Sequence, residues 1–176
     1  EDRREGFLQA VLVAPVARSA IVLGKVLGGT ILGMLQALLF LIVIFTPLIR
    51  ISLTGPGFVM LCCWMFITGF GLTTVGLVLA WPLKSTHEYH ALMSVILFPL
   101  WIFSGAAFPL EGTPVWLYWL MQINPLTHAL NLMRACFYAG GDGVVSAGAA
   151  AWVSIVYFLL FALAVYVLAL RMVRKN

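Results

Sequence analysis

The stretch "VLGGTILGMLQALLFLIVIFTPLI", residues Val26–Ile49, runs for 24 positions without a charged side chain. As an α-helix rising about 1.5 Å per residue it would be roughly 36 Å long, enough to cross a hydrocarbon core of about 30 Å with some tilt. Three further runs also lack charge, namely Phe58–Trp81, Ala91–Leu110 and Ala150–Leu170. We therefore expect an all-α membrane protein, a polytopic helical bundle with four spans.

The composition supports this class and excludes several others. The 176 residues are 63% hydrophobic and 9% charged, whereas a soluble domain is about 25% charged. The ten Lys and Arg residues bracket the apolar runs instead of forming a basic face, so we expect no nucleic-acid partner. Cys62, Cys63 and Cys136 have no metal-binding or redox spacing and are interpreted as small core residues.

The basic residues also predict the orientation of the chain. If the N-terminus is cytoplasmic, the outer segments hold only Arg50 and Arg134. The inner segments then hold Arg3, Arg4, Arg18, Lys25, Lys84, Arg171, Arg174 and Lys175. Basic residues favour the cytoplasmic side, so we expect a multi-pass protein of the plasma (inner) membrane with both termini of this chain cytoplasmic.

The spans carry no sign of their own chemistry. None has an ionisable residue away from its ends, although ion-coupled carriers generally need one inside the membrane. In "HEYH", His87–His90, the histidines are three apart, whereas a zinc-protease helix needs them four apart. We interpret them as part of a solvated loop and expect no catalytic residue and no metal site. Energy for any uphill transport would then come from another subunit.

Small residues recur at four-residue spacing in the first two runs. Gly24, Gly28, Gly29 and Gly33 form overlapping pairs, and Gly69 with Thr73 and Gly76 with Ala80 repeat the spacing. Such spacing lets helix backbones approach closely in lipid. The pattern fits a subunit interface and packing within one bundle equally well.

The first 25 residues predict a short amphipathic helix at the cytoplasmic surface. Phe7, Leu8, Val11 and Leu12 share one helical face, and Pro15 should end or kink the helix. The apolar face could rest on membrane lipid or dock a cytosolic partner. The sequence pattern leaves both open.

The stretch "IFSGAAFPLEGTPVWLYWLMQINP", Ile102–Pro125, does not leave the membrane as a simple polar loop. Pro109, Gly112 and Pro114 should break the third span, with Glu111 near the break. Val115–Ile123 could then dip back into the outer leaflet. Broken helices at membrane depth are tolerated only where protein or a water-filled path covers their freed backbone groups. We therefore expect a re-entrant outer gate.

The helix that follows carries a polar stripe. Asn124 should cap it, with Pro125 at its first position. Thr127, His128, Asn131 and Arg134 recur at three- and four-residue spacing. The stripe fits a helix lying at the outer interface with its polar side up, which we favour, or the lining of an exit path for substrate.

Two motifs resemble the ABC-2 family of ABC-transporter permeases. The segment "REGFLQAVLVAPVARSAIVLGK" is similar to the cytoplasmic segment of that family, with Phe7 and Gln9 in place of its usual Thr and Glu. The second motif resembles the family signature near the last two spans, and its matching residues are Ser104, Gly105, Phe108, Pro109, Pro114, Trp116, Asn124, Pro125, Leu126, Thr127 and Arg134. The drug- and lipo-oligosaccharide-exporting permeases are the most similar branch.

The resemblance implies a permease subunit that exports a drug, lipid or lipid-linked glycan and binds no cofactor itself. ATP and Mg would be bound by a separate ABC ATP-binding subunit, and a second permease copy would complete a homodimer in the lipid membrane. The implied ATPase-coupling residues are Arg4, Glu5, Gly6, Phe7, Leu8, Leu12, Pro15, Arg18, Lys84, His87 and Glu88. The implied gate residues are Ser104, Gly105, Phe108, Pro109, Glu111, Pro114, Trp116, Asn124 and Arg134.

We accordingly expect one transmembrane domain over 1–176, supplying the last four of a usual six spans. Its parts would be a coupling helix and lead-in at 1–25, spans at 26–49, 58–81, 91–110 and 150–170, an outer segment at 111–149, and a cytoplasmic tail at 171–176. The alternative is a non-transport membrane scaffold whose surface helix binds lipid or a partner.

Overall fold

The computed structural model describes residues 17–42, 53–83, 85–107, 113–138 and 148–175. Every regular element in these ranges is helical: α2 (Arg18–Leu41), α3 (Gly55–Ala80), α4 (Thr86–Trp101), the π-helix η2 (Ile102–Ala106), α5 (Val115–Ile123), α6 (Pro125–Tyr138) and α8 (Gly148–Lys175). Four helical stretches are long and apolar enough to cross a membrane: Ser19–Leu41, Gly55–Ala80, Thr86–Ala106 and Ala151–Arg174. The expected all-α fold with four spans is confirmed.

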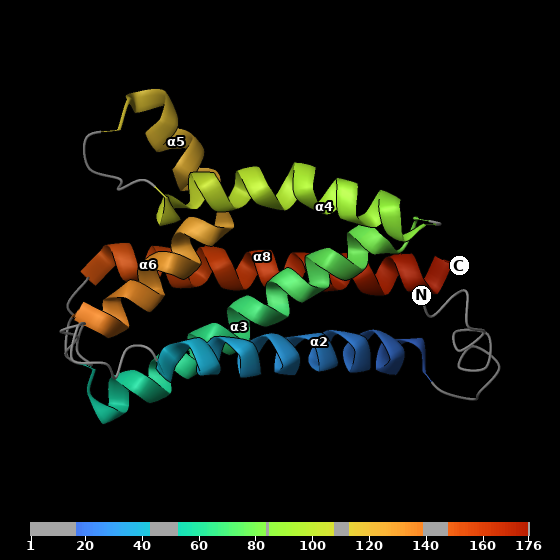
Figure 1. The fold of residues 1–176 in the computed structure, drawn as a ribbon, viewed down its shortest axis with the longest axis horizontal. Coiled ribbons are helices and arrows are strands. Elements are labelled where there is room, and N and C mark those ends of the chain that lie inside the picture. Colours follow the sequence, from blue (N-terminus) through green and yellow to red (C-terminus); the bar gives the residue numbers. More distant parts are fainter. Residues whose placement is uncertain (1–16, 43–52, 84, 108–112, 139–147, 176) are drawn as a thin grey trace.

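The long helices alternate in direction along the long axis of the molecule (Figure 1). α3 crosses the bundle diagonally and packs against both α2 and α8, which also contact each other. We call the end with the start of α2 and the end of α8 the inner end. The opposite end, where α3 starts and α6 lies, is the outer end. The predicted amphipathic helix, residues 1–16, lies outside the described ranges.

Side-chain caps explain where two of the spans begin. The Thr54 hydroxyl accepts a hydrogen bond from the Gly57 amide at 3.3 Å, and Pro56 occupies the first turn of α3. The Ser85 hydroxyl accepts from the Glu88 amide at 3.2 Å and starts α4. Both caps satisfy amides that have no partner within their own helix.

The inner bundle (α2, α3 and α8) is held by close packing at small residues. A methyl group added at Gly29 would lie 2.7 Å from Thr73 Cγ2, and one added at Gly71 would lie 3.4 Å from the Phe158 ring. Gly28 and Gly33, by contrast, have nothing within 4 Å of that position. For Gly29 the spacing of small residues therefore serves packing within one bundle.

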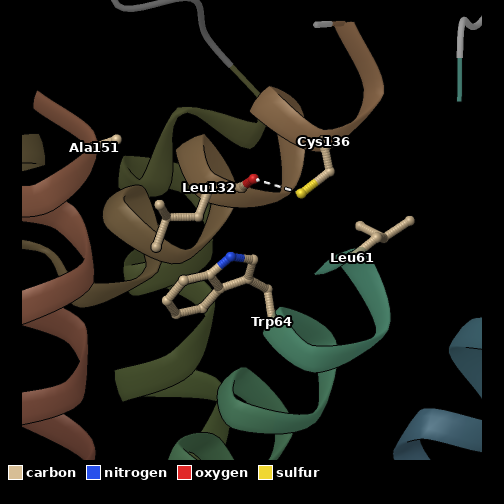
Figure 2. Packing of buried hydrophobic residues seen from close by; sticks show 5 residues of the cluster. All are labelled: Leu61, Trp64, Leu132, Cys136 and Ala151. Atoms are coloured by element: carbon tan, nitrogen blue, oxygen red, sulfur yellow. Dashed lines mark hydrogen bonds between the residues drawn. The ribbon is translucent and has the colours of Figure 1, made fainter. Parts of the chain in front are cut away.

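The outer end has its own apolar cluster, drawn from α3, α6 and α8. Figure 2 shows the Trp64 side chain of α3 beside Leu132 of α6, with Leu61, Cys136 and Ala151 around them. The Cys136 thiol donates to the Leu132 carbonyl at 3.3 Å, and burial raises the pKa of this thiol. Cys136 is thus a neutral core residue, as its isolated position predicted.

Helix boundaries depart from the predicted spans. α2 starts at Arg18, eight residues before the expected Val26, and α4 starts at Thr86, five before Ala91. Arg18–Lys25 therefore belongs to a helix and is not a lead-in, and α8 extends to Lys175. A charge-free run indicates the part of a helix that lies within the hydrocarbon. The helix can extend beyond that run, because charged side chains near its end reach the interface while the backbone hydrogen bonds continue.

Candidate functional site

The third span is broken just before its outer end. Pro99 lies inside α4, and since proline has no amide proton it removes one helical hydrogen bond. The helix then widens into η2 and turns at Gly105, whose φ is +84°. That left-handed backbone region favours glycine, and a methyl group there would also lie 3.3 Å from Met121 Cε. A break of this kind can leave backbone carbonyls without a regular helical partner.

Side chains of the following hairpin, α5 and α6, donate to those carbonyls. Asn124 Nδ2 lies 2.6 Å from the Leu100 oxygen, and Thr127 Oγ1 lies 3.4 Å from the Phe103 oxygen. Asn124 and Thr127 are both buried. These donors replace hydrogen bonds that water would supply outside the membrane.

Arg134 completes this arrangement about two helical turns after Thr127 on α6. Its Nη2 lies 2.6 Å from the Gly105 oxygen, and Gly105 itself is buried. A guanidinium donor makes a stronger hydrogen bond than a neutral one. We call η2, the Leu100 carbonyl and the donors Asn124, Thr127 and Arg134 the outer joint.

Ser104 stabilises the break from within. Its hydroxyl donates to the Trp101 carbonyl at 2.6 Å and accepts from the Ala106 amide at 3.4 Å. Ser104 is 1% exposed, so these two bonds satisfy a polar side chain that water does not reach.

Asn124 also forms the corner of the hairpin. Its Oδ1 accepts from the Leu126 amide at 3.0 Å, which caps α6, with Pro125 as the first helical residue. The same side chain therefore starts α6 and binds the end of α4. The predicted cap is confirmed.

A second polar cluster fixes the hairpin to α8. His128 Nε2 lies 2.9 Å from the Gln122 carbonyl, which can only accept, so in the neutral ring this nitrogen carries the proton. Nδ1 then accepts from the Ser154 hydroxyl at 3.0 Å. The His128 and Tyr157 rings are 4.4 Å apart, and the Tyr157 hydroxyl donates to the Ile123 carbonyl. The turn between α5 and α6 is thus bonded on both sides.

The sequence that carries this joint matches a known protein family. The sequence model of the ABC-2 type transporter family matches residues 2–138. The chain belongs to the ABC-2 type transporter family. The match includes α2 to α6 and both halves of the outer joint of this multi-pass membrane protein.

Named relatives agree with the family. The chain is 33% identical over 76% of its length to ycf38 of Cyanophora paradoxa, named as a transport permease, of which it covers 46%. It is 30% identical over its whole length to ABC transporter G family member 20 of Dictyostelium discoideum, covering 24% of it. It is 23% identical over 79% of its length to the inner membrane transport permease YhhJ of Escherichia coli, covering 37%. The chain spans less than half the length of each relative, and no solved structure matches it.

Four of the predicted gate residues of the ABC-2 permease lie together. Ser104 and Gly105 are in η2, Arg134 donates to the Gly105 carbonyl, and Asn124 donates to the Leu100 carbonyl at the end of α4. Pro114 and Trp116 lie at the exposed start of α5 and are not among the donors of the joint. Phe108, Pro109 and Glu111 lie outside the described ranges.

The favoured interpretation of the polar stripe was wrong. Thr127 is fully buried and His128 is 5% exposed, so this side of α6 faces the protein and not the outer water. The polar groups are needed there because the broken end of α4 offers carbonyls. Sequence reasoning also missed Ser154 and Tyr157. Their three-residue spacing in an apolar span was the available signal.

The predicted coupling residues are mostly outside the described part of the chain, which excludes Arg4, Glu5, Gly6, Phe7, Leu8, Leu12, Pro15 and Lys84. Arg18 begins α2, while His87 and Glu88 are exposed in the first turn of α4 at the inner end. The expected solvated loop at His87–His90 was therefore wrong, because Ser85 caps a helix there. Among the described residues no group of three metal-ligating side chains occurs.

Proposed function

We propose that this ABC-2 permease is the transmembrane subunit of an ATP-driven exporter and that the outer joint is its outer gate. The observation that supports the gate is the set of three hairpin side chains bonded to the broken end of one span. Such bonds are directional and few, so a small shift of α4 along α6 would break them together. A joint of this kind can switch between closed and open states.

The energy would come from a separate ABC ATP-binding subunit, which would hold ATP and Mg. Membership of the ABC-2 family supports this partner, as does a relative named as an ABC transporter. We place the contact at the inner end, on Phe7, Leu8 and Leu12 and on the exposed start of α4 at His87 and Glu88. α4 would then carry movement from the ATPase to the outer joint, since η2 continues it directly.

The proposed cargo is an amphiphile, that is a drug, a lipid or a lipid-linked glycan, leaving the cytoplasm. All sixteen residues of α4 are described and none is buried, so this helix is available to line a path or to meet a second permease copy. Two copies would form the complete unit. In the proposed orientation both termini of this chain are cytoplasmic in the inner membrane, with Arg18, Lys25, Arg171 and Arg174 at the inner end.

The test uses the full-length native protein, co-expressed with the ATP-binding subunit from the same operon or genome. We expect the two to co-purify, and we expect Leu8→Glu with Leu12→Glu to abolish association while membrane insertion persists. A charged residue on the apolar face would disrupt the contact with the ATP-binding subunit but not the spans. Unchanged association would contradict the coupling proposal.

The gate has its own test in the same complex. Arg134→Met should lower export of a fluorescent drug or lipid by about tenfold while ATPase association stays normal, because the bond to Gly105 is lost. Trp119→Leu, on an exposed side chain of α5 outside the predicted gate set, is the matched control and should export normally. Normal export by Arg134→Met would contradict the gate proposal and leave the coupling proposal untouched.

A further inference from the structure

A cavity of about 410 Å³ lies between α2, α3 and α4, away from the outer joint. α3 forms its floor with Thr73, Gly76 and Leu77, while α2 contributes Lys25 and α4 contributes Tyr89 and Met93. Gly76 lets α4 lie close to α3 beside the cavity, because a methyl group there would lie 3.1 Å from Met93 Cε and 3.5 Å from the Tyr89 hydroxyl.

The depth of the cavity follows from the packing of α2 on α3. Gly29 meets Thr73, and because the two helices are antiparallel, Lys25 and Leu77 lie about one turn closer to the inner end. α3 ends three residues after Leu77. In the proposed orientation Lys25 is therefore close to the inner membrane boundary, where phospholipid phosphates are found, and Thr73 is nearer the hydrocarbon.

The lining has an amphiphilic character. Lys25 supplies an ammonium group and Tyr89 a hydroxyl, whereas Leu72, Leu77, Ala80 and Met93 are apolar. None of the eight lining residues is acidic. Lys25 would attract a phosphate. The positively charged amine of a zwitterionic headgroup would have no carboxylate to bind among the lining residues. Apolar walls deeper in the cavity suit an acyl chain.

We propose that this cavity binds an anionic phospholipid of the inner-facing leaflet, with its phosphate on Lys25 and Tyr89 and an acyl chain along α3. Basic pockets between membrane helices on the cytoplasmic side bind anionic headgroups in this way. The site is separate from the outer joint, and it rests on the proposed orientation of the chain but not on the export proposal. Bound lipid would fill the gap between α4 and α2.

The test is native mass spectrometry of the full-length protein in detergent with phosphatidylglycerol and phosphatidylcholine of identical chains at equal concentration. We expect retention of phosphatidylglycerol and a drop of about fivefold in Lys25→Gln, the usual contribution of one basic residue at an anionic surface. Lys25→Arg should retain the lipid. Arg171→Gln, an exposed basic residue of α8 that does not line the cavity, is the matched control.

Three results would overturn the proposal. Equal loss in Lys25→Gln and Arg171→Gln would indicate general surface attraction, and displacement of the lipid by inorganic phosphate would indicate a free-anion site. The third concerns a phosphatidylglycerol with a photoreactive group on its acyl chain, which should label the peptide containing Met93. Absence of that label would mean that another segment of the protein covers the cavity. Thermal unfolding of each variant, expected to match the unsubstituted protein, shows that lipid loss is not loss of fold.

Discussion

The inner bundle and the outer joint are held together by different physics. In the inner bundle, continuous helices satisfy their own backbone, and the contacts are between small residues and methyl groups, such as Gly29 with Thr73. In the outer joint the helix is interrupted, and polar side chains of a neighbouring hairpin satisfy its carbonyls. Packing is sensitive to volume, whereas hydrogen bonds are sensitive to the chemical group. The two regions should therefore respond to opposite kinds of substitution.

The largest expected effect lies in the inner bundle. Gly29→Ala should destabilise the protein by about 2–3 kcal/mol, because its methyl group would be 2.7 Å from Thr73 Cγ2. The measurement is SDS titration of the full chain in detergent micelles, followed by circular dichroism. Gly28→Ala, with nothing within 4 Å, should change stability little.

A double variant sharpens that result. Thr73→Ser removes the methyl group in question while keeping the hydroxyl, so it should restore most of the stability lost in Gly29→Ala. If Gly28→Ala and Gly29→Ala behave alike, volume does not govern the inner bundle and this half of the comparison is wrong.

The next effect is at the outer joint. Arg134→Met nearly conserves length and apolar contact but removes the donor to the Gly105 carbonyl, so we expect a loss of about 2 kcal/mol. The same SDS titration applies, with Arg171→Met on the exposed side of α8 as control. Equal stability of the two variants would show that this bond contributes nothing.

Smaller losses of stability are expected for the two uncharged donors of the outer joint, Asn124 and Thr127, and the two losses should differ. Asn124→Ala removes both a helix cap and the bond to Leu100, and should lower stability by about 1 kcal/mol. Thr127→Val keeps the shape and removes one longer bond to Phe103, so about 0.5 kcal/mol is expected. A larger loss of stability in Thr127→Val than in Asn124→Ala would contradict the hydrogen bonds described for these two residues. Both values come from the same titration.

The smallest effect is expected on α5. Trp116 is 67% exposed, and Trp116→Leu should leave stability within about 0.5 kcal/mol of the unsubstituted protein. Most of the surface of this side chain is exposed, so its replacement removes little packing. A larger loss in the titration would mean that the hairpin depends on packing as well as on hydrogen bonds.

The sequence predicted much of this arrangement for physical reasons. Four charge-free runs of sufficient length imply four spans, and Asn-Pro before a helix implies a cap at Asn124. Ser104, Gly105, Asn124 and Arg134 were grouped through the break and the family resemblance, and the structure brings them together.

Other features were out of reach of sequence alone. A polar stripe on α6 has the same spacing whether it faces water or a broken helix, so its direction depended on where η2 lies. Ser154 and Tyr157 find their partners 26 and 34 residues away, and no local pattern encodes such pairings. Helix ends were misplaced because charge marks the membrane boundary, while a cap such as Ser85 marks the first hydrogen bond.

The acceptors of the outer joint are main-chain oxygens, and this determines which of its positions can change during evolution. Every residue type has a carbonyl, so Leu100 and Phe103 could be exchanged for other apolar residues without removing an acceptor. Their partners Asn124 and Arg134 have no such freedom, since few side chains carry a donor of the required reach. In a saturation scan, the acceptor positions on the span should therefore tolerate many substitutions, whereas the donor positions on the hairpin should tolerate few. Gly105 would be the exception on the span, because its backbone angle and not its oxygen restricts it.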